Sequence, residues 1–262
     1  MPGSANLNLM INTARKAARL LLKDFREVEN LQVSVKGPGD FVSKADQGAE
    51  RLIREELKNG RPTYGWLGEE TGEEPGEDPT RRWIVDPLDG TTNFLHGIPH
   101  WAISIALEHK GAITAAVVYD PCRDEMFLAE KGTGCWLNSN RRMRVSARRS
   151  MSEALFATGI PFGSKNTLPA TLKDMSALMP VSAGARRMGA ASLDLAWVAA
   201  GRFDGYWERE LQPWDVAAGL LLVTEAGGLV EGIRVAENPL ESGNILAANG
   251  QLFSSLAEMI RN

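Results

Sequence analysis

Residues 82–94 contain the feature that most constrains the fold, an apolar run that ends at a pair of carboxylates. The run 83–85 consists of Trp, Ile and Val, which favour a buried β-strand, and Asp86 and Asp89 follow it closely. Pro87 has no backbone N–H, so it cannot continue a central strand. The sequence therefore predicts that a strand ends at Asp86 and that both carboxylates lie in the turn after it.

The residues that follow the second aspartate are typical of an anion-binding turn. Gly90 lets the backbone approach a ligand closely, and Thr91, Thr92 and Asn93 favour a helix start with available N–H groups and hydroxyls. A divalent cation would reconcile carboxylates with such neighbours, because the carboxylates hold the metal while the metal and the N–H groups hold a phosphate. The alternative is a tight Asp–Gly turn in which Asp86 caps a helix.

Two motifs of similar appearance are excluded by spacing. In the haloacid-dehalogenase phosphatases one residue separates the two aspartates, whereas Pro87 and Leu88 both intervene here. In an EF-hand the twelfth position must be a chelating Glu, and that position falls on Gly97.

A second predicted strand, residues 64–68, also ends in acids. Glu69 and Glu70 follow it and begin an acidic segment, rich in Gly and Pro, that runs to Asp78 and should be exposed. If the two strands are neighbours in one sheet, their terminal carboxylates converge, which is a second indication of a metal site. Alternatively, Glu70 belongs only to the solvated segment.

The rest of the chain predicts a mixed α/β protein. Helices are expected at 7–28, from Asp46 onward, and at 166–178, 189–200, 214–226 and 252–260. Further strands are expected at 102–108, 112–119 and 125–130, as an antiparallel meander, and at 154–158, 205–208 and 244–248. A polar, basic stretch at 146–151 suggests a boundary between an N-terminal half, 1–145, and a C-terminal half, 146–262. The segment 36–46 is predicted to be a loop that folds over a site or a plain hairpin.

Composition and charge exclude several classes of function. A hydrophobic content of 44% is ordinary for a globular protein, and a net charge of −4 argues against a nucleic-acid-binding surface. Cys122 and Cys135 have no metal-ligand or redox spacing, and no apolar run reaches membrane-spanning length. These features predict a cytoplasmic protein that binds neither nucleic acid nor membrane.

Three separated blocks, 68–70, 86–93 and 214–219 continued by 225–228, resemble the inositol monophosphatase family in order and spacing. The resemblance covers the whole chain and is strongest with the bacterial branch, through 186–189 and 193–196. It implies a layered α-β-α-β-α sandwich of the inositol monophosphatase and fructose-bisphosphatase type. It also implies a Mg²⁺-dependent, lithium-sensitive phosphomonoesterase that forms a homodimer.

The resemblance assigns roles to particular residues. One Mg²⁺ is implied at Glu69, Asp86 and the carbonyl of Leu88, a second at Asp86, Asp89 and Asp215, and a third, weaker ion near Glu69. The catalytic residues that the resemblance implies are Thr91, Asp46 and Glu69, of which Thr91, supported by Asp46, orients the attacking water. The amides of Gly90 and Thr91 are implied to bind the phosphate. The other substrate-binding residues that it implies are Gly189, Ala190, Ala191, Glu208 and Asp215. Lys36 and Asp40 also fall at family positions. For Asp215 a helix-capping role and for Glu208 a surface ion pair with Arg209 or another base are the structural alternatives.

The carboxylate set is consistent with this chemistry without the family name. Crowded carboxylates raise one another's pKa, and two cations relieve that repulsion and promote in-line attack of water on phosphorus. The expected substrate is a small polyol phosphate, foremost inositol-1-phosphate, but Ala190 replaces a family threonine. Histidinol phosphate, fructose bisphosphate, a nucleotide 3′-phosphate and glycerol phosphate therefore stay open, as does a regulatory role with the transcription machinery.

Overall fold

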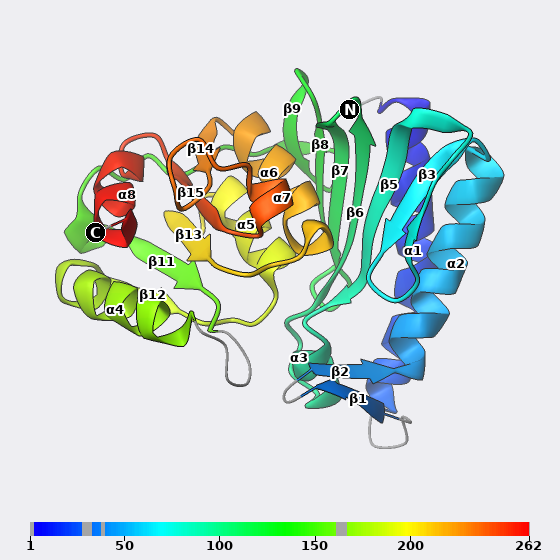
Figure 1. The fold of residues 1–262 in the computed structure, drawn as a ribbon, viewed down its shortest axis with the longest axis horizontal. Coiled ribbons are helices and arrows are strands. Elements are labelled where there is room, and N and C mark those ends of the chain that lie inside the picture. The colour runs from blue at the N-terminus through cyan, green and yellow to red at the C-terminus, as the bar shows by residue number, and fades with distance from the viewer. Residues whose placement is uncertain (1–2, 28–32, 38–39, 161–166, 262) are drawn as a thin grey trace.

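A computed structural model describes residues 3–27, 33–37, 40–160 and 167–261, and of residues 33–37 and 40–43 it describes only the backbone. The chain forms five layers, helix, sheet, helix, sheet, helix (Figure 1). The helices of these layers are α1 (Ala5–Arg26) and α2 (Lys44–Gly60) on one side, α5 (Ala191–Ala199) and α6 (Pro213–Glu225) between the sheets, and α4 (Leu168–Leu178) and α8 (Phe253–Arg261) on the other side. The predicted sandwich is confirmed.

The first sheet has eight strands in the order β10-β9-β8-β7-β6-β5-β3-β4. In chain order they are β3 (Tyr64–Gly68), β4 (Gly72–Glu74), β5 (Asp78–Asp89), β6 (Ala102–His109), β7 (Ala112–Asp120), β8 (Glu125–Glu130), β9 (Gly134–Leu137) and β10 (Arg141–Arg142). The predicted meander is confirmed as β6, β7 and β8, each antiparallel to the next. Strands β3 and β5 are parallel neighbours, so their carboxyl ends meet at the same edge of the sheet.

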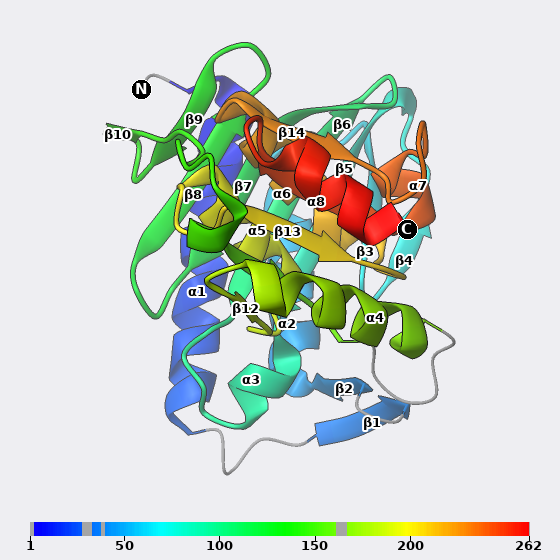
Figure 2. The same ribbon diagram turned by 90° about the vertical axis from the view of Figure 1, so that its left-hand side faces the viewer.

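The second sheet has the order β12-β11-β13-β15-β14, and Figure 2 shows it behind the outer helices α4 and α8. Its strands are β11 (Leu155–Thr158), β12 (Gly184–Arg186), β13 (Gly205–Glu208), β14 (Gly228–Glu231) and β15 (Ile245–Asn249). The smaller elements are the hairpin β1 (Val33–Gly37) and β2 (Asp40–Ser43), α3 (Thr91–Leu95), α7 (Pro239–Ser242) and 3₁₀ turns at Met151–Glu153 and Met179–Val181.

The position of each helix in the layers explains its sequence pattern. In α1 the apolar side chains of one face are buried against the first sheet, with Met10 and Leu21 fully enclosed. Each such burial stabilises the fold by about 1.5–3 kcal/mol. Helices α5 and α6 are covered by both sheets and are therefore apolar around most of their circumference rather than along one stripe. Within the described residues, no helix combines the length and the apolar character needed to cross a membrane.

The prediction that a strand ends at Asp86 is wrong. Strand β5 continues to Asp89, which pairs with Ala102 of β6, and the ladder is interrupted only between Asp86 and Asp89. Pro87 has no N–H to contribute, so the chain bulges there and then rejoins the partner strand. Both aspartates are consequently buried, with 2% and 8% of their surface exposed, rather than lying in an open turn.

Other predicted boundaries shift by a few residues. The segment predicted as a loop or a hairpin is the hairpin β1–β2, whose tip at residues 38–39 lies outside the described residues. Helix α2 begins at Lys44, two residues before the predicted start, so Asp46 lies within its first turn. The helices predicted at 7–28 and 166–178 are α1 and α4, and residues 28 and 166 lie outside the described part of the chain.

Candidate active site

The parallel pairing of β3 and β5 brings the acid that follows β3 beside Asp86 of β5. Gly68 lies opposite Val85, so the next residues, Glu69 and Asp86, leave the ladder side by side. The backbone N–H of Glu69 donates to the carbonyl of Val85 at 3.2 Å, which keeps the two strand ends in register. The predicted convergence of the two acid-terminated strands is confirmed.

Asp86 is at the centre of the acidic group. Burial raises its pKa well above the ordinary value, and the charges of Glu69, Asp89 and Asp215 raise it further. Its Oδ1 accepts one hydrogen bond, from the backbone N–H of Leu88 at 2.9 Å, which lowers the pKa only in part. Four carboxylates from three elements, the ends of β3 and β5 and the start of α6, thus act on one another.

Asp89 is held by the middle helix layer. Its Oδ2 accepts hydrogen bonds from the backbone N–H of Ser192 at 2.7 Å and from the Ser192 hydroxyl at 2.5 Å. Burial raises the pKa of Asp89, while the two bonds from Ser192 and the charge of His100 lower it. The sequence interpretation named no role for Ser192, although the residue belongs to the block 189–192 that falls at positions of the resembled family.

Thr91 and Asp46 are in contact, as the resemblance implied. The Thr91 hydroxyl lies 3.0 Å from Oδ1 of Asp46 and 3.1 Å from the carbonyl oxygen of Leu88. Gly90, just before α3, has φ of +94°, and a Cβ at that position would lie 3.1 Å from the carbonyl oxygen of His100. Glycine is therefore required on both counts, because the backbone passes close to the 189–190 segment in a left-handed conformation.

Asp215 caps its helix and also lies in the acidic group. Its Oδ2 accepts a hydrogen bond from the backbone N–H of Gln212 at 2.7 Å, in a capping box at the start of α6. Its charge also acts on Asp86, so it belongs to the acidic group. Capping fixes where the carboxylate lies, and the position of α6 between the sheets points it toward β5.

Comparison with known proteins gives a family match over nearly the whole chain. Residues 6–262 match the profile of the inositol monophosphatase family. The chain belongs to this family. An inositol-1-monophosphatase of Rhizobium meliloti is 55% identical over 261 residues, covering 100% of this chain and 98% of that protein. The Nus factor SuhB of Pseudomonas aeruginosa is 45% identical over 259 residues, covering 97% and 95%. A crystal structure of the extragenic suppressor protein suhB from Bartonella henselae superposes with a TM-score of 0.95 at 49% identity, covering 99% of each chain.

Membership in the inositol monophosphatase family confirms the fold and the class of enzyme predicted from the sequence. Enzymes of the family are lithium-sensitive phosphoric monoester hydrolases that use Mg²⁺ as cofactor. This chain is a phosphatase of that family, and a phosphorylated polyol fits the family as substrate.

Three acids of the acidic group accept hydrogen bonds from N–H groups of the chain itself. Leu88 N–H binds Asp86, Ser192 binds Asp89, and Gln212 N–H binds Asp215. Across the described residues, no three His, Cys, Asp or Glu side chains form a ready-made ligand group. The carboxylate and carbonyl oxygens are nevertheless hard donors of the kind that Mg²⁺ prefers. Burial, and after it the charges of Glu69, Asp89 and Asp215, raise the pKa of Asp86, and a cation would offset both effects. The donor set therefore fits Mg²⁺.

Glu208 is at the end of β13 and is not paired with Arg209. Arg209 instead donates to Asp174 of α4, so the predicted ion pair between Glu208 and Arg209 is wrong. The hydroxyl of Tyr206 donates to Oε2 of Glu208. Burial raises the pKa of Glu208 to about 7, and the charges of Asp194 and Asp89 contribute to the rise. Glu208 therefore faces the acidic group from the second sheet.

The segment 189–191 lies beside the turn that follows β5. Gly189 has φ of +85°, Ala190 is buried, and Ala191 begins α5. The side-chain amide of Asn93 donates to the carbonyls of Met188 and His100, each at 2.8 Å. This amide ties α3 to the chain before α5, a contact that the sequence interpretation did not anticipate. Lys36 and Asp40 lie in β1 and β2, and their side chains are outside the described residues.

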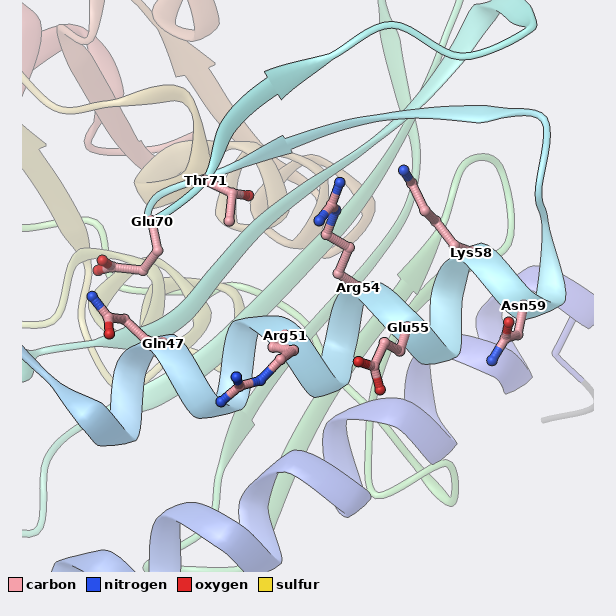
Figure 3. A pocket seen from close by; sticks show the side chains of 8 residues that line it. All are labelled: Gln47, Arg51, Arg54, Glu55, Lys58, Asn59, Glu70 and Thr71. Carbon is pink, nitrogen blue, oxygen red and sulfur yellow. The ribbon is translucent and has the colours of Figure 1, made fainter.

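A hollow of about 680 Å³ lies along α2, and none of the four acids Glu69, Asp86, Asp89 and Asp215 lines it (Figure 3). It is lined by Gln47, Arg51, Arg54, Glu55, Lys58, Asn59, Glu70 and Thr71. Arg54 and Lys58 both bind the carboxylate of Glu74 and hold its pKa down to about 2. Two of the three cationic side chains that line the hollow are thus already paired with an acid of β4.

Proposed function

We propose that this chain hydrolyses inositol-1-phosphate with Mg²⁺ as cofactor, by attack of water on phosphorus. The observation that carries the proposal is the buried acidic group, in which Glu69 and Asp86 lie side by side where the pairing of β3 and β5 ends. Burial raises the pKa of Asp86, and the charges of Glu69, Asp89 and Asp215 raise it further. The names of relatives that are 49–55% identical, all inositol-1-monophosphatases, support this choice of substrate.

The metal ligands of the proposal are Glu69, Asp86, Asp89, Asp215 and the carbonyl oxygen of Leu88, for two ions and a weaker third near Glu69. When bound, Mg²⁺ would offset the charge of these acids, acidify a water and stabilise negative charge on the phosphoryl group. Ser192 would keep Asp89 oriented through its two hydrogen bonds. Gln212 would do the same for Asp215.

Thr91 and Asp46 would orient the attacking water. The Thr91 hydroxyl has one proton, which it donates to Asp46 or to the Leu88 carbonyl, so its lone pairs stay available to accept from water. Glu69 lies at the same edge of the sheet and would act on this water from the β3 side. The amides of Gly90 and Thr91 would bind the phosphoryl oxygens at the turn after β5.

Glu208 and the segment Gly189, Ala190 and Ala191 would contact the alcohol part of the substrate. Glu208 faces the acidic group, and its carboxylate can accept hydrogen bonds from polyol hydroxyls. Ala190 is buried and provides no hydroxyl, so recognition from this segment would come from backbone groups and shape.

A phosphate-release assay over a substrate panel tests the proposal. The panel contains inositol-1-phosphate, histidinol phosphate, fructose bisphosphate, a nucleotide 3′-phosphate and glycerol phosphate, each with Mg²⁺ and with EDTA. We expect the highest kcat/KM on inositol-1-phosphate, loss of activity in EDTA, recovery with Mg²⁺ and inhibition by Li⁺. Another substrate preferred by tenfold or more would refute the assignment, and full activity in EDTA would refute the use of metal.

We propose a regulatory role in transcription as a second candidate function. It is favoured by the relative from Pseudomonas aeruginosa, 45% identical, that is named Nus factor SuhB. Transcript elongation by purified RNA polymerase and its factors would be measured with and without the wild-type chain and an Asp86→Asn variant. An equal effect of both proteins supports a role independent of phosphatase activity, and no effect of either refutes it.

We further propose that the protein is a cytoplasmic homodimer. Within each chain, the N-terminal half, 1–145, and the C-terminal half, 146–262, would together complete the active site. The layered fold supports the division, because β3 and β5 belong to the first half while Asp215 and Glu208 belong to the second. Light scattering of the purified protein tests the dimer, and a monomer at micromolar concentration would refute it.

A further inference from the structure

Glu208 is held in place from two sides by residues with no assigned role. Tyr206 and Glu208 are two positions apart on β13, so their side chains share one face of the strand. That face looks toward the middle layer, since Tyr206 packs with α5 and α6 while Trp207 packs with the outer layer. The Tyr206 hydroxyl, completely buried, donates to Oε2 of Glu208.

Gly159 borders the same carboxylate from the neighbouring strand. Strand β11 pairs with β13 in parallel, with Thr158 opposite Trp207, and the Thr158 hydroxyl donates to the Trp207 carbonyl at 2.6 Å. Gly159 follows directly, and a Cβ at this position would overlap the carboxyl group of Glu208. The space that Glu208 occupies therefore exists only because residue 159 has no side chain.

We propose that Tyr206 and Gly159 are positioning residues for substrate choice, which hold the Glu208 carboxylate where a polyol hydroxyl can reach it. Tyr206 occupies one oxygen, Oε2, and directs the other toward the substrate. The inference rests on the proposed role of Glu208 in binding polyol hydroxyls.

The charges around Glu208 explain why a neutral donor is needed. Asp194 of α5 and Asp89 of β5 repel the carboxylate, Arg187 before α5 attracts it, and burial disfavours its charged form. A phenol hydroxyl stabilises the carboxylate without adding a charge that would compete with a substrate for it. Tyr206 therefore does more than satisfy its own buried hydroxyl.

The principal test is Tyr206→Phe, which removes one oxygen and keeps the ring in the core. The quantity measured is the ratio of kcat/KM on inositol-1-phosphate to kcat/KM on an aryl phosphate, which has no polyol hydroxyls. Loss of a charge-assisted hydrogen bond should lower this ratio roughly tenfold to a hundredfold, mainly through a higher KM on inositol-1-phosphate. Gly159→Ala should lower the ratio in the same direction, because its methyl group displaces the carboxylate.

Tyr119→Phe is the matched control. Its hydroxyl also donates to a carboxylate, Oδ1 of Asp124 at 2.8 Å, but at the turn between β7 and β8. The ratio for this variant should match that of the wild type. Thermal unfolding of each variant without substrate shows whether the fold is retained, and Gly159→Ala keeps the test informative if Tyr206→Phe does not fold.

The outcomes separate this inference from the proposed function. A lower ratio for Glu208→Gln with a wild-type ratio for both Tyr206→Phe and Gly159→Ala overturns the positioning role and leaves the proposed function intact. Equal losses on both substrates in Tyr206→Phe show a general structural role and also overturn it. An unchanged ratio in Glu208→Gln removes the proposed role of Glu208, and the positioning role with it.

Discussion

Replacing Thr91 by alanine should lower kcat by at least about a hundredfold while leaving the Mg²⁺ requirement nearly unchanged. The hydroxyl lies 3.0 Å from Oδ1 of Asp46, which is 1% exposed. A hydrogen bond to a charged group of this kind is worth about 1.5–3 kcal/mol, or roughly tenfold to 150-fold in rate. Loss of a positioned group that takes part in proton transfer typically lowers the rate by about 10²–10⁴-fold. The expected loss of kcat is therefore at or above the upper end of the range given by the hydrogen bond alone.

The assay is steady-state phosphate release from inositol-1-phosphate at increasing Mg²⁺, which yields kcat at saturating metal and the half-saturating Mg²⁺ concentration. Thr91→Ser is the matched control, since it keeps the hydroxyl and loses only a methyl group. Asp46→Asn and the double variant complete a cycle. Because Thr91 and Asp46 would act as a unit, the double variant should be little slower than either single variant.

Two results would refute the reasoning. If Thr91→Ala keeps its kcat at saturating metal but needs much more Mg²⁺, Thr91 supports the metal rather than the water. If the losses of the two single variants multiply in the double variant, Thr91 and Asp46 act independently, and their 3.0 Å contact has no role in orienting water.

Three further predictions concern the acids. Asp215→Asn keeps an acceptor for the Gln212 N–H, so the free energy of unfolding should change by less than about 1 kcal/mol; kcat should nevertheless fall strongly, and wild-type turnover would leave Asp215 with capping alone. In EDTA at neutral pH, Asp86→Asn should be more stable to urea than the wild type, because burial and three acids raise the pKa of Asp86 in the folded state and its ionised form opposes folding. The difference in stability should shrink as the pH falls toward the pKa of Asp86 in the unfolded state, and a variant less stable than the wild type would contradict this. Because the pKa of Glu208 is raised to about 7, the ratio of kcat/KM on inositol-1-phosphate to kcat/KM on an aryl phosphate should fall as the pH drops through about 7. Glu208→Gln should abolish this pH dependence of the ratio, and a ratio that still falls would show that another group titrates.

Much of the fold and of the acidic group could be predicted because local patterns determine them. The meander at β6, β7 and β8 follows from alternating and continuous apolar runs between turn residues, which no distant contact needs to decide. The two acid-terminated strands could be placed side by side because the carboxyl ends of neighbouring parallel strands meet at one edge. Asp215 could be placed at a helix start because proline, an acid and an apolar run follow one another there.

The course of β5 beyond Asp86 depended on tertiary structure. Pro87 prevents regular pairing locally, but the burial of Asp89 and its pairing with Ala102 are gained only when β6 lies alongside. The strand therefore bulges at Pro87 and continues, and both aspartates become buried instead of exposed. The local rule that proline interrupts strand pairing was correct at Pro87, but the prediction that the strand ends there was wrong.

The partners of the site residues were likewise decided by the packed layers. Ser192 binds Asp89 across 103 positions of sequence, and Asn93 binds the Met188 carbonyl across 95. Arg209 directly follows β13 and lies next to Glu208 in the chain, yet it donates to Asp174 of α4 in the outer layer, whereas Glu208 faces the middle layer. Glu208 instead shares its face with Tyr206 and meets the bare backbone of Gly159 from the adjacent strand. Residue types and spacing determine which groups can bind a metal or a hydroxyl, whereas sheet register and layer packing determine which of them meet.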